Sequence, residues 1–254
     1  MTPTPIDPWE RLAAGAAALG APLTSDQMAA FQRYTALLIE TNRHVNLTAV
    51  RDLESIIPKL HLDSLSLLAP IAAAAGLPVA ALRSQPWRAV DVGSGAGIPG
   101  LPLLFAWPPL RLTLIESVQK KARFLTEVIF LLSEQAEVLA ERAEVVGQGA
   151  AWRQQYDLVL ARAVAPLPTL VELTLPLARV GGLAALPKGP GLHEELAQAG
   201  AAIALLGGEV AAVHDLLIPG VVEQRTLLLL RKVRPTPAAY PRRAGLPAKS
   251  PLAS

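Results

Sequence analysis

The sequence contains no cysteine among its 254 residues. This absence excludes a disulfide framework, a thiolate metal site and an iron–sulfur cluster. It also excludes chemistry on C5 of a pyrimidine that proceeds through a cysteine adduct, because that chemistry needs a thiol nucleophile. We expect a protein that works without a metal.

Signals for secretion and for membrane insertion are scarce as well. The first ten residues carry Asp7 and Glu10 and no basic residue, the opposite of the start of a signal peptide. The uncharged run from Leu65 to Leu82 is broken by two prolines and a glycine, which favours a helix end and a loop over a membrane span. With a net charge of +2 and 52% hydrophobic residues, the chain is expected to be a globular, cytoplasmic monomer.

Length and pattern divide the chain into three parts. Residues 1–87 are expected to form an N-terminal helical extension, with one helix at Trp9–Leu19 and a second that begins at the N-cap cluster Thr24–Asp26. Residues 88–233 alternate between strands and helices, which predicts an α/β core with a mostly parallel sheet. Seven strands are expected near 88–92, 111–116, 136–141, 156–162, 181–187, 209–214 and 225–231. Residues 234–254 form a basic, proline-rich C-terminal tail.

The core begins with the stretch Arg88–Gly100, an apolar strand that runs into a glycine-rich turn and then a helix start. Glycines at 93, 95 and 97 suit a chain reversal that needs positive φ, and they leave backbone amides bare. Such amides at a helix N-terminus bind nucleotide-like ligands. A tight turn without any ligand is the alternative.

Two acids beside this turn narrow the choice of ligand. Gly95, Gly97 and Gly100 match the dinucleotide pattern G-x-G-x-x-G, but Asp91 precedes the first glycine of the run and would repel a pyrophosphate. Asp91 would instead attract the α-ammonium group of S-adenosylmethionine. Glu116 ends the next strand, where a carboxylate accepts both hydroxyls of an adenosine ribose. These features resemble the class I S-adenosylmethionine-dependent methyltransferases.

Two further positions follow strand ends. After the third strand, the amide of Ala143 and the carboxylate of Glu144 are placed to read adenine, although an acid at a helix start also simply stabilises the helix. After the fourth strand, Arg162 stands where ligands of open α/β sheets bind. A packing role explains an arginine between two alanines poorly, so we place Arg162 at the reaction centre.

The fourth strand also lacks a motif. Enzymes that methylate exocyclic amines carry Asn or Asp with two prolines and an aromatic residue here, whereas this chain has Ala161–Pro166. The N7 atom of guanine needs no such motif, because its lone pair lies in the ring plane and carries no proton. Catalysis there reduces to positioning and desolvation.

The tail has no acid at all. From Arg231 to Ser254 there are six basic residues and five prolines, a composition that predicts a segment too polar to pack into a core. It suits a phosphate backbone, with Tyr240 available for stacking and Lys188 at the same rim of the sheet. A solubilising tail is the alternative.

In the N-terminal extension, the four-residue spacing of Lys59 and Asp63 favours a surface ion pair along a helix.

Taken together, these stretches form an ordered set: Asn46–Ala49, Lys59–Leu65, Asp91–Gly100, Lys120–Leu125, Arg142–Glu144, Ala161–Ala163, Lys188-Gly189 and Tyr240–Arg242. Over residues 27–252 the sequence resembles the small-subunit ribosomal RNA guanine-N7 methyltransferases, the RsmG family, formerly glucose-inhibited division protein B. The match covers most of the chain, so it is far more specific than a single glycine motif.

The resemblance implies a Rossmann-like, seven-stranded methyltransferase core. It also implies methyl transfer from S-adenosylmethionine to N7 of guanine 527 in the 530 loop of 16S ribosomal RNA, on naked RNA, the 30S subunit or an assembly intermediate. Cofactor contacts are implied at Gly93, Ile98, Glu116, Ser117, Val118, Ala143, Glu144 and Arg162, beside Asp91 and Gly95 of the turn. Arg162 is the expected catalytic residue, and RNA contacts are expected from Lys59, His61, Lys188, Arg242 and Arg243.

Three other functions stay open at this point. A small-molecule methyltransferase could share the fold but would not need the basic tail. A nicotinamide oxidoreductase would use the dinucleotide pattern. An RNA-binding assembly factor would keep a cofactor pocket without activity.

Overall fold

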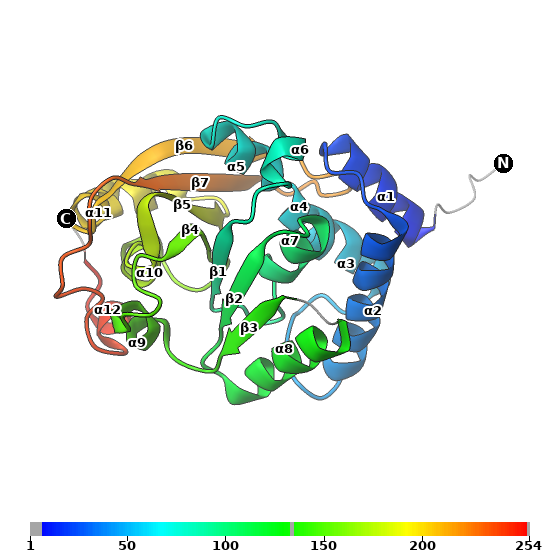
Figure 1. The fold of residues 1–254 in the computed structure, drawn as a ribbon, viewed down its shortest axis with the longest axis horizontal. Helices are drawn as coiled ribbons and strands as arrows, with labels where there is room; N and C mark the ends of the chain where they lie inside the picture. Colours follow the sequence, from blue (N-terminus) through cyan, green and yellow to red (C-terminus); the bar gives the residue numbers. More distant parts are fainter. Residues whose placement is uncertain (1–6, 133–134, 253–254) are drawn as a thin grey trace.

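The structure, a computed structural model, describes residues 7–132 and 135–252. Its centre is a seven-stranded sheet in the order β3-β2-β1-β4-β5-β7-β6 (Figure 1). The strands are β1 Arg88–Val92, β2 Arg111–Ile115, β3 Ala136–Leu139, β4 Tyr156–Leu160, β5 Ala178–Lys188, β6 Gly208–Leu216 and β7 Arg225–Lys232. Strand β7 runs antiparallel to β5 and β6, and the other pairs are parallel. The predicted mostly parallel, seven-stranded sheet is confirmed.

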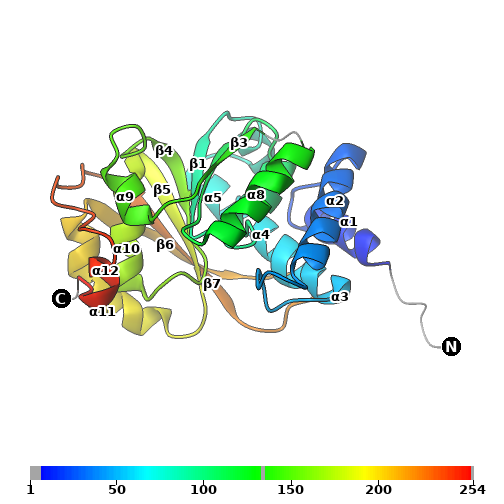
Figure 2. The same ribbon diagram turned by 90° about the horizontal axis from the view of Figure 1, so that it is seen from below.

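Helices cover both faces of this sheet. Those of the core are α7 Gly100–Ala106, α8 Gln119–Leu132, α9 Ala143–Gln148, α10 Leu167–Thr174 and α11 Leu192–Leu205, and α12 Leu246–Lys249 lies in the tail. The N-terminal extension contributes α1 Pro8–Ala18, α2 Ser25–Thr41, α3 Leu53–Ile56, η1 Ile57–Leu62, α4 Asp63–Leu65, α5 Leu68–Ala74 and α6 Val79–Leu82. Figure 2 shows α1–α4 and α8 on one side of the sheet and α9–α12 on the other.

Two hydrophobic cores result, because successive side chains of a strand point to opposite faces. In β1, Ala89 packs into the core shared with Phe31 of α2, whereas Val90 packs into the core shared with Leu170 of α10. The sheet is therefore buried on both faces, as parallel sheets in α/β proteins are.

The extension is an integral layer of the fold. Thr24 caps α2 through a capping box with Gln27, as its N-cap position predicts. The helical run Leu53–Ala74 is long and apolar enough to cross a membrane by length and composition alone, but 78% of its most apolar window is buried inside the protein. It behaves as a core helix.

The expected surface ion pair between Lys59 and Asp63 is wrong. Residues Ile57–Leu62 form a π-helix, whose wider turn changes which side chains share a face. Lys59 Nζ lies 3.5 Å from Glu223 Oε1 on the surface, whereas Asp63 is 4% exposed and faces the sheet. The carboxylate of Asp63 meets Arg162 there.

The prediction that the tail stays outside any core is also wrong. The guanidinium of Arg153 donates hydrogen bonds to the carbonyls of Thr236, Pro237 and Tyr240 at 2.6–3.1 Å, and the hydroxyl of Thr169 donates to Pro247 O at 3.1 Å. These bonds hold the tail against the face covered by α9 and α10. The composition of the tail could not reveal them, because every partner lies elsewhere in the chain.

Most cations near the C-terminus are used within the protein. Lys232 is fully buried and donates to the carbonyls of Leu175 and Leu206, which end α10 and α11. Arg231 donates to Ala74 O at 2.6 Å, and Arg234 donates to Ala204 O at 3.0 Å. Within the described ranges, two of the six predicted tail cations, Arg243 and Lys249, are exposed and have no partner in the protein. The surface available to a polyanion is thus smaller than the sequence predicts.

Candidate functional site

The glycine turn after β1 has the conformation that its composition requires. Gly93, Gly95 and Gly97 have φ of +69°, +58° and +88°, a region that L side chains rarely adopt. A Cβ atom on Gly93 would lie 2.8 Å from Cγ2 of Val164, which follows β4. The turn therefore excludes side chains both by its backbone and by its neighbours.

Two side chains hold this turn in place. Glu116 is 5% exposed, and its carboxylate accepts hydrogen bonds from the N–H of Gly95 at 2.9 Å and of Val118 at 2.7 Å. From the opposite side, the hydroxyl of Tyr34 in α2 donates to Ala96 O at 2.7 Å. Each oxygen of Glu116 has a second lone pair for a ligand hydroxyl. The sequence analysis did not identify Tyr34 as a residue of this site.

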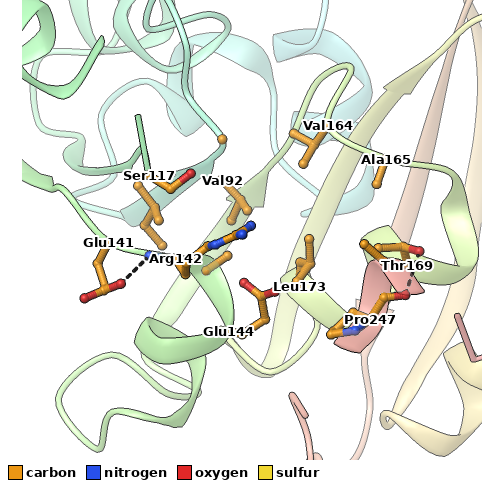
Figure 3. Close-up of a pocket in the computed structure, with 14 residues that line it drawn as sticks. Val92, Ser117, Glu141, Arg142, Glu144, Val164, Ala165, Thr169, Leu173 and Pro247 are labelled. Atoms are coloured by element: carbon orange, nitrogen blue, oxygen red, sulfur yellow. Dashed lines mark hydrogen bonds between the residues drawn. The ribbon is translucent and has the colours of Figure 1, made fainter. Parts of the chain in front are cut away.

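A pocket of about 170 Å³ lies beside the turn (Figure 3). It is lined by Val92, Gly93, Ile115, Ser117, Glu141, Arg142, Ala143, Glu144, Val164, Ala165, Thr169, Leu173, Pro247 and Ala248. Four of the predicted cofactor residues are among them, namely Gly93, Ser117, Ala143 and Glu144. The other predicted ones, Asp91, Gly95, Ile98, Glu116, Val118 and Arg162, lie outside this lining in the described part of the chain.

The tail forms one wall of the pocket. Glu144 is 6% exposed, and its Oε1 atom accepts a hydrogen bond of 2.7 Å from Gly245 N. Pro247 and Ala248 then complete the lining, with Pro247 held by Thr169 (Figure 3). No sequence signal identifies these two residues, because the contact depends on where the tail returns.

Asp91 lies in β1 with an incomplete set of hydrogen bonds. It is fully buried, its Oδ2 atom accepts from Gly100 N at 3.0 Å, and its Oδ1 atom has no partner. Burial raises the pKa of Asp91 to about 7, opposed by the Gly100 N–H and by Arg162 and reinforced by Glu116. A cationic group bound next to Oδ1 would restore the ionised form.

Arg162 follows β4 and is fixed by the N-terminal extension. Its Nη1 atom lies 2.8 Å from Asp63 Oδ2, and its Nη2 atom donates to Lys59 O at 3.1 Å. Burial raises the pKa of Asp63, and both Arg162 and Arg225 lower it. Nη1 is buried and lacks a partner in hydrogen-bond geometry. Asp63 is a site residue that the sequence patterns assigned to the surface.

The unpaired atoms fit the expected cofactor. Buried polar atoms without partners cost free energy unless a ligand or water satisfies them. Asp91 Oδ1 is an acceptor without a partner, and Arg162 Nη1 makes no hydrogen bond of good geometry although Asp63 Oδ2 lies 2.8 Å away. The methionine end of S-adenosylmethionine offers an ammonium and a carboxylate, which match both. A nicotinamide dinucleotide would place a pyrophosphate beside Asp91 instead.

The residues predicted to contact RNA are placed unequally. His61 is fully buried and edge-on to Phe31 at 5.0 Å between ring centroids, with Nε2 2.7 Å from Thr35 Oγ1. Burial lowers the pKa of His61 to about 3, so the imidazole is neutral. The predicted contact between His61 and RNA is therefore wrong, because η1 turns the ring into the core.

The other predicted RNA contacts are cationic side chains with different partners. Lys188 Nζ lies 2.6 Å from Glu195 Oε2. Arg242 is bound by both oxygens of the fully buried Glu172 at 2.6–3.1 Å. Arg243 is exposed. Its charge is available to a ligand, whereas that of Arg242 is already matched within the fold.

Among the described residues, no group of three or more His, Cys, Asp or Glu side chains could hold a metal ion. The site offers backbone amides, carboxylates and guanidinium groups instead.

The sheet order, the glycine turn, Asp91 near the end of β1 and Glu116 directly after β2 define a class I S-adenosylmethionine-dependent methyltransferase fold. A solved structure with a similar fold is the branched-chain polyamine synthase C9 mutein from Thermus thermophilus, with a TM-score of 0.55 and 14% identity, covering 83% of this chain and 65% of that one. This likeness concerns the fold alone.

The model of the family described as "GidB: rRNA small subunit methyltransferase G" matches residues 27–227. The ribosomal RNA small subunit methyltransferase G of Roseiflexus castenholzii is 47% identical over 92% of this chain and 95% of its own. That of Symbiobacterium thermophilum is 45% identical over 94% and 95%. The chain belongs to the rRNA small subunit methyltransferase G family.

Proposed function

We propose that the protein transfers a methyl group from S-adenosylmethionine to N7 of a guanine in the 530 loop of 16S ribosomal RNA, in the cytoplasm. The observation that carries the cofactor assignment is that two of the three buried side-chain atoms without a hydrogen bond in the described residues are Asp91 Oδ1, just before the glycine turn, and Arg162 Nη1, just after β4. The membership of an rRNA methyltransferase family supports the RNA substrate.

The roles of the residues follow from their positions. S-adenosylmethionine supplies an electrophilic methyl group on a sulfonium. Asp91 would bind the ammonium and Arg162 the carboxylate of its methionine end, while Glu116 would accept the ribose hydroxyls with its remaining lone pairs. Glu144 and the N–H of Ala143 would read adenine at the wall that the tail completes.

The reaction needs no general base. N7 of guanine carries no proton, so the site has to hold the nucleophile in line and exclude water. Positioning of this kind contributes about 7–11 kcal/mol to a bimolecular reaction. Arg162, held from two sides by Asp63 and by Lys59 O, is a rigid group on which such positioning can be built.

RNA would bind through the exposed cations around the carboxyl ends of the strands. Lys59 and Arg243 are exposed enough to meet phosphates, and Lys188 lines the neighbouring cavity. We assign Arg242 to holding the tail, because Glu172 already neutralises its charge.

The decisive experiment incubates labelled S-adenosylmethionine with unmethylated 16S RNA and, separately, with unmethylated 30S particles. We expect label in RNA and N7-methylguanine at a single position in the 530 loop. Label at another atom, or none on either substrate, contradicts the proposal. A thermal-shift comparison, in which S-adenosylhomocysteine stabilises the protein and NAD does not, separates a methyltransferase from an oxidoreductase.

A further inference from the structure

A second cavity adjoins the cofactor pocket. Its volume is about 300 Å³, at the small end of ligand sites, and Ala165 lines both spaces. Its charged lining consists of Asp63, Arg162, Arg225, Lys188 and Glu195, with Pro187 among its apolar residues. The cavity lies beyond the carboxyl ends of β4 and β5, where the loop after β4 and the end of β5 meet.

The backbone between the two spaces is strained. Ala163 has φ of +55°, a left-handed conformation that residues other than glycine rarely adopt. Such conformations persist where the surroundings enforce them, and they gather at functional sites. The strained residue directly follows Arg162 and itself lines the second cavity.

Within the described residues, one carboxylate oxygen of Glu195 has protein partners and the other has none. Lys188 Nζ lies 2.6 Å from Oε2, and Leu167 N donates to the same atom at 2.6 Å. In the described part of the chain, every contact recorded for this carboxylate goes to Oε2, which leaves Oε1 without a protein partner. The side chain is 29% exposed and lines the cavity. It is thus an anchored acceptor that faces a space beside the cofactor pocket.

We propose that the second cavity receives the target guanine and that Glu195 reads its Watson–Crick edge, accepting hydrogen bonds from N1–H and the N2 amino group. This proposal rests on the function proposed above. Enzymes that act on a single base commonly read that edge. A carboxylate is an acceptor without a donor, so it matches guanine and repels the lone pair at N1 of adenine.

The orientation also suits the reaction. N7 lies on the Hoogsteen edge of the purine, a different edge from N1–H and N2, so a carboxylate bound at N1–H and N2 leaves N7 uncovered. When the methyl group transfers, its bond to sulfur breaks, a bond to N7 forms, no proton moves, and the positive charge passes from sulfur to the purine. The carboxylate, whose charge Lys188 already balances at 2.6 Å, holds the base in this orientation while the methyl group transfers.

Inosine tests the proposal because it lacks the N2 amino group and keeps N1–H and N7. The substrate is whichever of 16S RNA or 30S particle supports methylation, with guanine or inosine at the target position. For the wild-type protein we expect kcat/KM to be about 10- to 100-fold lower on inosine than on guanine. This is the effect of losing one hydrogen bond to a charged group, here the bond from the N2 amino group to Glu195. For Glu195→Gln, activity on guanine should fall and the guanine-to-inosine ratio should shrink to within about threefold.

The matched control is Glu194→Gln, which removes the same charge from the same helical turn at an exposed position. It should keep the wild-type ratio. S-adenosylhomocysteine affinity should be unchanged in both variants. In Glu195→Gln alone, equilibrium binding of the guanine and inosine RNAs without methyl donor should lose its preference for guanine.

An unchanged ratio in Glu195→Gln overturns the role of Glu195. If that variant fails to fold, the wild-type ratio decides, because a value near one overturns the proposal by itself. If the wild-type protein forms no N7-methylguanine on the guanine RNA, the proposed function has failed rather than this inference.

Discussion

The Nη1 atom of Arg162 lies 2.8 Å from Oδ2 of Asp63. Asp63 belongs to α4 of the N-terminal extension and Arg162 to the loop after β4, so this contact ties the extension to the centre of the site. Arg225 Nε, at the start of β7, lies 3.8 Å from the other oxygen of Asp63. One buried carboxylate thus organises two arginines that line the second cavity.

Replacing Asp63 by Asn should disturb both arginines. Removing one partner from a buried ion pair costs about 3–5 kcal/mol, and we expect about 2 kcal/mol here because both guanidinium groups are partly exposed. A misplaced Arg162 should lower kcat about 10- to 100-fold. Chemical denaturation and single-turnover methylation measure the two effects. Glu223→Gln removes an exposed ion pair with Lys59 and should change neither.

Arg242→Ala should loosen the wall of the cofactor pocket. The substitution leaves Glu172 buried without its partner, which should lower the free energy of unfolding by about 3 kcal/mol. Because the same tail carries Pro247 into the pocket, the Kd for S-adenosylhomocysteine should rise at least about tenfold. Calorimetric titration checks this value. An unchanged Kd would show that the tail does not contribute to cofactor binding.

Arg243→Ala, one position further along, should behave differently. The side chain is exposed, so stability and S-adenosylhomocysteine affinity should stay at their wild-type values. RNA affinity should fall, and the slope of log Kd against log salt should decrease by about one. Filter binding over a salt series measures the slope. Equal salt slopes in the variant and the wild type would exclude a phosphate contact.

Gly93→Ala should abolish cofactor binding. Gly93 and Gly76 both have φ of +69°, so both substitutions carry the same backbone strain of about 1–2 kcal/mol. A Cβ atom on Gly93 would lie 2.8 Å from Val164, whereas one on Gly76 meets nothing within 4 Å. Thermal shift with S-adenosylhomocysteine should be lost in Gly93→Ala and retained in Gly76→Ala. Retention in both would mean that the turn does not hold the ligand.

Cofactor affinity should depend on pH through Asp91. Its pKa is about 7 in the folded protein against 3.8 ordinarily, so between these values the folded state holds a proton that the unfolded chain has released. The contribution of Asp91 to stability therefore falls as pH rises through that window. A bound ammonium favours the ionised carboxylate, so S-adenosylhomocysteine affinity should rise with pH up to about 7, at most about tenfold per unit.

Calorimetry at a pH of about 6, in two buffers of different ionisation enthalpy, should show release of a proton on binding. Asp91→Asn should abolish both the proton release and the rise of S-adenosylhomocysteine affinity with pH. Proton release that persists in Asp91→Asn would assign the titration to another group.

The class of fold and the cofactor turn are determined by the sequence itself. Short apolar runs, the glycine series and the acids at positions 91 and 116 are local features, and each constrains its own backbone or its immediate neighbours. These features sufficed to predict the seven strands and the place of the turn.

The tertiary structure decided which charges remain free. Local spacing suggested that Lys59 pairs with Asp63, and the basic tail suggested that Arg242 contacts RNA. In the structure, Asp63 pairs with Arg162 and Arg242 pairs with the buried Glu172. The energy of an ion pair depends on distance and burial in space, and those follow from chain segments far apart in the sequence. For the same reason, the tail wall of the cofactor pocket and the open oxygen of Glu195 became visible only once the fold had brought their partners together.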